Sequence, residues 1–215
     1  MAAIASPYGL RPLQLIGSQF NNTSAVREYL MFTNSANPIF NGDLVQITGG
    51  NIAAYTSASP TVGTTFGIVG VCVGVRYVDP TMKYFINAQF LPANAVTNGY
   101  TQIYIKVYED PDALFLIQGN AQISATLNTA LASIGKNAAI AYTAGSTTTG
   151  NSANTLTVGS IAVTATLALR VVDFYWGQSS AANNPAGNSS ATDLFPDIIV
   201  KFNQGLHAYY ASTGL

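Results

Sequence analysis

The chain has 215 residues and a formal net charge of −1, and only 8% of its residues are charged, against about a quarter in ordinary soluble domains. Its eight Lys and Arg residues are scattered singly from Arg11 to Lys201, which argues against binding to a nucleic-acid backbone. A polar but uncharged surface provides little repulsion between copies, so this composition favours a protein that works within an assembly.

The first 23 residues predict an extended N-terminal arm. Two prolines, Pro7 and Pro12, disfavour a helix. The absence of a basic n-region argues against a signal peptide. Such an arm either packs on its own domain or reaches a neighbouring subunit, and the sequence leaves both open. The apolar anchors in this segment are Tyr8, Leu10, Leu13 and Leu15.

Short apolar runs then predict several strands in the first half of the chain. Residues 44–48 and 52–55 flank Gly49, Gly50 and Asn51, the pattern of a β-hairpin, and residues 41–43 before them read as a turn. Residues 66–78 form the most apolar segment, with glycines whose spacing does not fit a dinucleotide-binding loop and which indicate bulges instead. Further strands are expected at residues 26–32 and 82–91.

Residues 100–118 predict a central β-hairpin. The first run alternates polar and apolar residues with a period of two, as in a half-buried strand. A second apolar run occupies residues 113–118. Between them, residues 109–112 have the sequence Glu-Asp-Pro-Asp, which is typical of a tight turn.

One short helix is expected after this segment, capped by Ser124 and ended by Gly135. Strands are expected again at residues 167–172, 198–202 and 206–210. Long polar loops are predicted near residues 143–155 and 177–192. The fold class is therefore all-β: a single β-sandwich over residues 24–215, jelly-roll-like or another Greek key.

The inventory of reactive side chains is small, and we expect no enzymatic activity, cofactor or metal. His207 is the only histidine, and no nucleophile-elbow motif occurs. Cys72, the only cysteine, lies in an apolar run and is expected to pack as a small hydrophobe. The acidic residues 109–112 could hold calcium, although turn chemistry explains them without a metal. The loop at residues 145–150 (GSTTTG) lacks the lysine of a P-loop.

Two long uncharged segments, residues 44–75 and 137–169, are interrupted by Gly, Ser, Thr and Pro. Neither is expected to span a membrane.

Five short segments, in this order along the chain, resemble a family of small structural proteins of tailed bacteriophages, the capsid decoration or cement proteins. They are residues 6–12 (SPYGLRP), 39–45 (IFNGDLV), 108–118 (YEDPDALFLIQ), 145–150 (GSTTTG) and 167–171 (LALRV).

The resemblance implies a β-rich subunit without enzymatic activity, in a homo-oligomer such as a trimer, bound to the major capsid protein on the outer surface of the virion. Multivalency would let many weak contacts hold it there. The residues expected to contact the capsid or sister copies are Pro7, Tyr8, Leu10, Arg11, Pro12, Leu13 and Trp176.

Two other functions remain open at the level of the sequence. A tail-tube, connector or fibre component would form rings or repeats, and no internal repeat is visible. A carbohydrate-binding β-sandwich would use Trp176 and exposed tyrosines to stack against sugars.

Overall fold

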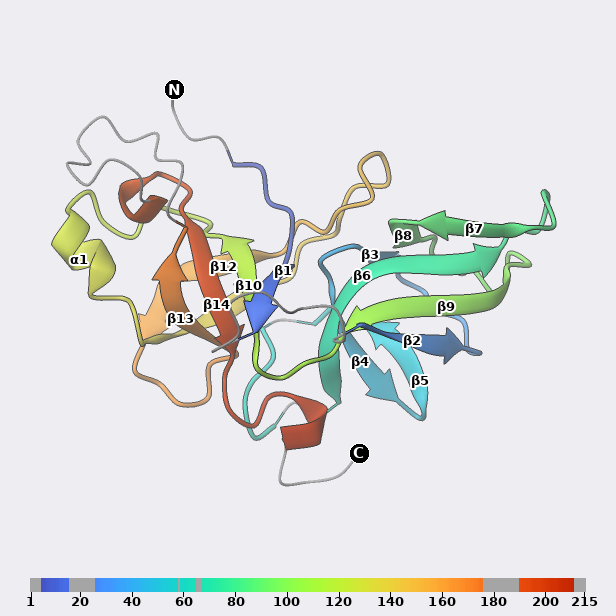
Figure 1. Cartoon of the computed structure of the whole chain (residues 1–215), viewed down its shortest axis with the longest axis horizontal. Helices are drawn as coiled ribbons and strands as arrows, with labels where there is room; N and C mark the ends of the chain where they lie inside the picture. Colours follow the sequence, from blue (N-terminus) through green and yellow to red (C-terminus); the bar gives the residue numbers. More distant parts are fainter. Residues whose placement is uncertain (1–4, 16–25, 58, 65–66, 176–189, 211–215) are drawn as a thin grey trace.

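The computed structural model describes residues 5–15, 26–57, 59–64, 67–175 and 190–210. It is mostly β, with 47% strand and 6% helix, and its strands pair antiparallel in three sheets. The expected all-β fold with one short helix is confirmed. Figure 1 shows an elongated molecule with one large sheet toward each end, and we call these two parts lobe A and lobe B.

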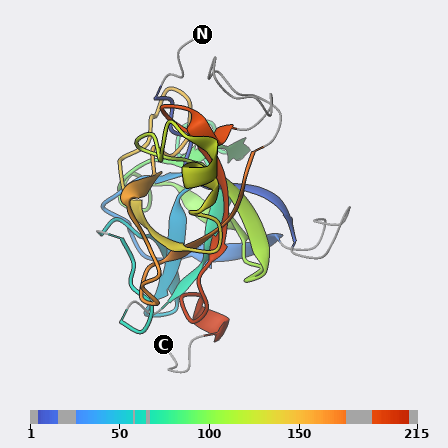
Figure 2. The ribbon, with the colours of Figure 1, turned by 90° about the vertical axis from the view of Figure 1, so that its left-hand side faces the viewer.

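Lobe A is built on a six-stranded sheet that curves back on itself. The strand at one edge of this sheet, Thr155–Ala162, returns to the end of the strand Ala113–Gln118 near the other edge. There Gly119 and Leu156 form a bridge, and Asn120 N donates to Leu156 O at 3.0 Å. Figure 2, which looks at the molecule from the lobe A end, shows these strands wrapping around a common interior. In order across the sheet, the strands are β1 (Arg11–Leu15), β10 (Ala113–Gln118), β14 (Asp197–Phe202), β13 (Leu169–Phe174), β11 (Asn137–Ala141) and β12 (Thr155–Ala162).

Lobe B contains the second six-stranded sheet and a two-stranded one. The order across the larger sheet is β2 (Val26–Met31), β9 (Thr101–Tyr108), β6 (Ile68–Val78), β4 (Leu44–Thr48) and β5 (Asn51–Ala54), with β7 (Phe85–Ala88) paired to β6 outside this path. The small sheet pairs β3 (Ile39–Phe40) with β8 (Phe90–Leu91). The expected single strand at residues 82–91 is therefore divided into β7 and β8.

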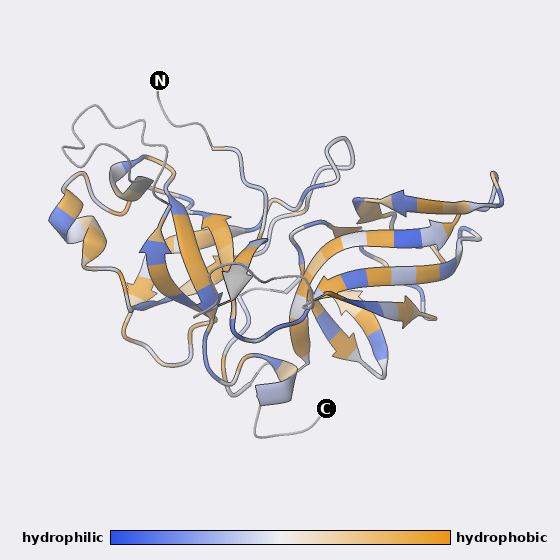
Figure 3. Ribbon diagram, in the orientation of Figure 1, coloured by the Kyte–Doolittle hydropathy of each residue, from blue (hydrophilic) through white to orange (hydrophobic). Residues whose placement is uncertain are grey.

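The buried side chains form two clusters, and one of them crosses between the lobes. The first fills lobe A and also includes Leu44, Ile68 and Tyr108 from the strands of lobe B. The second lies inside lobe B and takes Val69 and other residues of the same strands. Strand β6 therefore contributes to both clusters, with Ile68 on one face and Val69 on the other. Register shifts at residues 68–70 and 72–74 interrupt the alternation along the strand. Figure 3 shows the apolar residues concentrated on the strands of both lobes.

The predicted central hairpin is wrong. Strand β9 pairs with β2 and β6, whereas β10 pairs with β1 and β14, so the two strands belong to different sheets. Residues 109–112 do form a turn, in which Asp110 Oδ1 accepts from Asp112 N at 2.8 Å, but this turn carries the chain from lobe B to lobe A. Alternation and turn residues predicted the strands; they carried no information on which neighbours the strands would hydrogen-bond to.

Two local predictions in lobe B are confirmed. Strands β4 and β5 form the expected hairpin, with Thr48 opposite Asn51. Gly49 and Gly50 both have positive φ, +55° and +78°, as a two-residue hairpin turn of the primed type requires. The turn at residues 41–43 is also present, and Asp43 N donates to Phe40 O at 3.1 Å.

The single helix, α1 (Leu127–Leu131), lies where it was expected but is shorter. Its N-cap is Thr126 instead of Ser124, whose hydroxyl accepts from Thr126 N at 3.1 Å. Gly135 has the predicted left-handed conformation, with φ +83°.

The expected strand at residues 206–210 is not formed. His207 makes one bridge to Ile68, and a 3-10 helix, η2 (Ala208–Tyr210), follows. A second 3-10 helix, η1 (Ser190–Thr192), precedes β14. Most of the loop predicted at residues 177–192 lies outside the described residues.

Candidate functional site

The described part of the N-terminal arm, residues 5–15, belongs to lobe A. Strand β1 pairs with β10 as the edge of the sheet, so residues 5–15 lie on their own fold. Leu10 is fully buried in the core and its N–H donates to Gly42 O at 3.0 Å. Its side chain is therefore not available for the predicted contact with a partner.

The other predicted contact residues are spread along the arm. The Tyr8 hydroxyl donates to Asp197 Oδ1 at 2.6 Å, and burial together with this hydrogen bond raises the pKa of Tyr8. Arg11 is exposed and its guanidinium lies 4.2 Å from the centre of the Tyr8 ring, a cation–π arrangement. Pro7, Pro12 and Leu13 are half-buried, and Trp176 lies outside the described residues.

One contact between the lobes, which we call the glycine joint, consists of Gly9, Gly42, Asp43, Gly145 and Ser152. Backbones approach closely there: a Cβ on Gly9 would lie 2.5 Å from Gly42 O, and a Cβ on Gly42 would lie 2.6 Å from Tyr8 O. Both glycines also have positive φ. Only glycine fits such positions without displacing the neighbouring chain.

Asp43 is the polar centre of the glycine joint. Its carboxylate accepts from Phe40 N at 2.9 Å and from Asn154 Nδ2 at 3.4 Å, and Ser152 also hydrogen-bonds to it. Burial raises the pKa of Asp43, because a carboxylate loses hydration when it leaves water.

The loop at residues 145–150 packs on this joint. Gly150 O accepts from Asn41 N at 3.1 Å, and Ser152 N donates to Asn41 O at 2.8 Å. Three of the segments that carry the family resemblance, residues 6–12, 39–45 and 145–150, therefore meet here.

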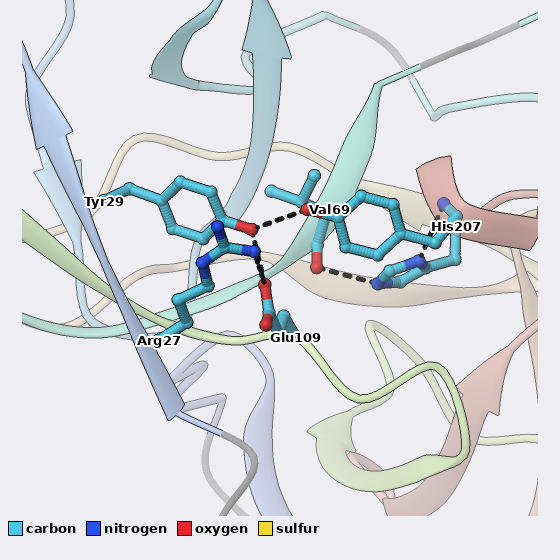
Figure 4. Close-up of polar contacts among 6 residues, drawn as sticks. Arg27, Tyr29, Val69, Glu109 and His207 are labelled. Carbon is cyan, nitrogen blue, oxygen red and sulfur yellow. Dashed lines mark hydrogen bonds and ion pairs between the residues drawn. The ribbon is translucent and has the colours of Figure 1, made fainter. Parts of the chain in front are cut away.

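A second contact between the lobes, the histidine joint, consists of Tyr29, Val69, Glu109, His207 and Tyr209. His207 is only 1% exposed; its Nε2 lies 2.8 Å from Val69 O and its Nδ1 accepts from Tyr209 N at 3.3 Å (Figure 4). A carbonyl beside Nε2 and an N–H beside Nδ1 match a neutral ring that carries its proton on Nε2. Burial lowers the pKa of His207.

Tyr29 closes the histidine joint from the side of lobe B. Its hydroxyl donates to Glu109 Oε2 and lies 2.9 Å from the Tyr209 hydroxyl. Arg27 approaches the same Glu109 carboxylate at 3.9 Å (Figure 4). Burial, followed by the hydrogen bond to Glu109, raises the pKa of Tyr29, so the phenol stays protonated as a donor.

Each candidate reactive group is buried or already paired with another group of the fold. Both ring nitrogens of His207 are occupied by backbone groups. Cys72 is fully buried, as predicted, and burial raises its pKa to about 12. Asp112 pairs with Lys201 at 3.2 Å. Within the described ranges, no group of three or more His, Cys, Asp or Glu side chains could hold a metal ion.

Exposed apolar side chains occur on both lobes of the molecule. At the end of lobe B, the β6–β7 connection carries Met82 and Tyr84, and Phe85 begins β7; these side chains are 57%, 58% and 45% exposed. On lobe A, the loop between β12 and β13 carries Val163, 86% exposed. Figure 1 shows the β6–β7 connection at the tip of lobe B and the β12–β13 loop along the lower side of lobe A. The sequence predicted an aromatic strand near residue 85 but gave no sign that its start would be exposed.

No family model, no curated protein and no solved structure matches this chain. Among the helices that the structure describes, none is long and apolar enough to cross a membrane.

Proposed function

We propose that this chain is a non-enzymatic structural protein of a bacteriophage virion, which binds the outside of the capsid and cements neighbouring capsomers. The observation that carries this proposal is the presence of exposed apolar side chains on both lobes of an elongated molecule with few charges. A protein that joins two neighbours needs two separated contact surfaces, and the exposed side chains on the two lobes are candidates for them.

The energetics suit a protein that binds in many copies. Burying one large apolar side chain contributes about 1.5–3 kcal/mol, and much of this is offset by the entropy lost on association. A surface with Met82, Tyr84 and Phe85 therefore gives weak binding by itself. Oligomerisation, for example as a trimer, would multiply such contacts against the major capsid protein on a repeating lattice.

The arm supports the proposal in a different way from the one expected. Because Leu10 belongs to the core, deleting the arm would destabilise lobe A as well as remove contacts. Arg11, which is exposed and stacked on Tyr8, is the arm residue best placed to reach a partner. Tyrosine and arginine are also enriched where interfaces derive most of their energy.

The direct test measures the mass of the purified protein by light scattering and its co-sedimentation with candidate capsid shells. We expect a discrete small oligomer that binds shells at a saturable, lattice-like ratio. A ring-sized oligomer that does not sediment with shells would overturn the proposal in favour of a tail or connector component.

Variants on the two lobes test whether both surfaces contribute. We expect Y84S and V163S each to weaken co-sedimentation about tenfold or more, since each removes exposed apolar surface without touching the core. T147S, a change at an exposed polar position, serves as the control and should bind like the wild type. Equal binding by all three variants would contradict the assignment of these surfaces.

A further inference from the structure

A hollow of about 310 Å³ lies beside the start of β13 and the end of β14, next to the histidine joint. We propose that it binds an acidic sugar, a hexose ring that carries a carboxylate. The inference goes beyond the structural role proposed above and does not depend on it. The residues of the hollow that carry the argument are Asp112, Arg170, Lys201, Gln204 and Tyr210.

Arg170 is held in one orientation by neutral partners. Its Nε donates to Asn137 Oδ1 at 3.1 Å and its Nη2 donates to Asn203 Oδ1 at 3.4 Å. Both amides are themselves fixed: Asn137 Nδ2 donates to Thr164 O at 2.9 Å, and Asn203 Nδ2 donates to Ala165 O at 2.8 Å. The guanidinium is therefore preorganised at little further cost in entropy.

The Arg170 guanidinium has N–H donors left over for a ligand. An arginine has five N–H donors, and the two bonds to Asn137 and Asn203 leave three of them for other partners. Among the described residues, no carboxylate lies within ion-pair distance of Arg170. A planar fork of this kind matches the two oxygens of a carboxylate.

The charge of the hollow favours a single negative charge on the ligand. Lys201 also lines it, but its ammonium pairs with Asp112 at 3.2 Å, and the pair is close to neutral. The one charge in excess is that of Arg170. A carboxylate balances this charge, whereas a doubly charged phosphate monoester would leave one negative charge unbalanced.

The remaining walls suit a hydroxylated ring more than a simple acid. Tyr210 is 55% exposed, and its ring lies beside the hollow with its centre 6.4 Å from that of the His207 ring, edge to face. An exposed aromatic face of this kind can pack against the apolar face of a sugar ring. Gln204 is exposed, and Asp112 provides acceptors for hydroxyl groups.

The test uses the full chain labelled with 15N and titrated with three probes: D-glucuronate, D-glucose and the peptide-like acid N-acetyl-aspartate amide. We expect saturable shifts with D-glucuronate, centred on residues 170 and 201–210. Binding of D-glucose should be at least about tenfold weaker, because it lacks the carboxylate. N-acetyl-aspartate amide should also bind at least about tenfold more weakly, because it lacks the ring.

Variants separate this site from a general effect of charge. R170Q should weaken D-glucuronate binding at least about tenfold, whereas K83Q, which removes one positive charge at the β6–β7 turn, should leave it unchanged. Y210A should weaken both sugars. If R170Q does not fold, K201Q replaces it, since exposed ion pairs contribute little stability, and a loss of several-fold is then expected.

Three results would overturn the proposal. They are equal affinity for D-glucuronate and D-glucose, equal or tighter binding of N-acetyl-aspartate amide, and the absence of saturable shifts with all probes. The second result would instead assign the hollow to an acidic side chain of a protein partner.

Discussion

The glycine joint and the histidine joint both hold lobe A against lobe B, but they rely on different parts of the chain. At the glycine joint, the contacts are mainly between backbones, and the missing side chains of Gly9 and Gly42 allow them. At the histidine joint, the contacts are made by side-chain groups of Tyr29, His207 and Tyr209, which come from opposite ends of the sequence.

This difference has consequences for how each joint tolerates change. A joint made by close backbone approach fails when atoms are added, since nothing nearby can move without shifting a strand. A joint made by side-chain hydrogen bonds fails when polar groups are removed or change their protonation. The first should therefore be sensitive to sterics and the second to pH.

The largest expected effect is that of G9A. Its Cβ would lie 2.5 Å from Gly42 O and the backbone there has φ +73°. The matched control is G50A, which has nearly the same φ, +78°, with open space around it. We expect G50A to cost about 1 kcal/mol from backbone strain alone and G9A about 3 kcal/mol or more, because overpacking adds to the strain.

Thermal and urea unfolding measure this pair of variants. Equal losses of stability in G9A and G50A would show that the close approach at the glycine joint contributes nothing beyond the backbone conformation.

The next largest effect is that of D43A, which removes the carboxylate at the centre of the glycine joint. Phe40 N–H and the Asn154 amide would lose their acceptor while still buried. Leaving such groups unpaired costs about 1–3 kcal/mol. The control is D110A, in the turn between the lobes, where Asp110 accepts one hydrogen bond from Asp112 N at an exposed site; we expect a loss below about 1 kcal/mol. Urea titration compares the two, and a D110A variant as unstable as D43A would contradict this ranking.

Short-range features of the fold were predictable from the sequence, and long-range ones were not. Gly49 and Gly50 identified the β4–β5 hairpin because turn geometry depends on the residues within the turn. Gly135 identified a left-handed position near the end of α1 for the same reason. In contrast, the pairing of β9 and β10 depends on strands more than eighty residues away, such as β14, and no local pattern records it.

The same division applies to the candidate site. The arm was recognised as extended because of Pro7 and Pro12, but the burial of Leu10 depends on Gly42 and other residues distant in sequence. Likewise, Arg170 could be read only as one residue of a strand; its position above the hollow depends on Asn137 and Asn203. Tertiary packing decides which side chains are exposed and which come together in space. Composition and alternation along the chain do not specify that packing.

At the histidine joint, the expected signature is a dependence of stability on pH. The pKa of His207 is lowered in the fold by burial, so the unfolded chain binds a proton more readily than the folded chain. The contribution of His207 to the free energy of unfolding is therefore fully present above the pKa of the unfolded chain, about 6.5. It is lost as the pH falls toward the pKa of His207 in the folded chain. Asp43 has the opposite sign: its raised pKa penalises the folded chain as the pH rises above the ordinary carboxyl range.

The difference in the free energy of unfolding between wild type and H207Q isolates the contribution of His207, because Asp43 is present in both proteins. At pH 7.5 we expect H207Q to be about 1–3 kcal/mol less stable than the wild type, because it gives up well-placed hydrogen bonds to Val69 and Tyr209. On acidification to pH 5.5, we expect H207Q to lose less stability than the wild type loses. Urea midpoints at the two pH values provide the measurement. Parallel decreases for both proteins would contradict the assignment of the pH dependence to His207.

The smallest expected effect is that of Y29F, which tests the outer edge of the histidine joint. The change removes one hydroxyl, which donates to Glu109 and meets the hydroxyl of Tyr209, and leaves the ring in place. Because the site is partly exposed, water can replace the lost partners, and we expect a loss of only about 0.5–1.5 kcal/mol. Y104F, on the neighbouring strand β9, removes a hydroxyl that has no hydrogen-bond partner among the described residues and should cost less.

The size of the Y29F effect also distinguishes two accounts of how the lobes are held. If Tyr29, Glu109 and Tyr209 act as one network, Y29F and Y209F together should cost clearly less than the sum of the single changes, because each removes the same hydrogen bond. If the two lobes are held by the shared core alone, both variants should unfold at the wild-type urea concentration, and the double variant should show no coupling. The shared core around Ile68 and Tyr108 sets the stability common to all these variants, so any coupling that remains belongs to the polar network.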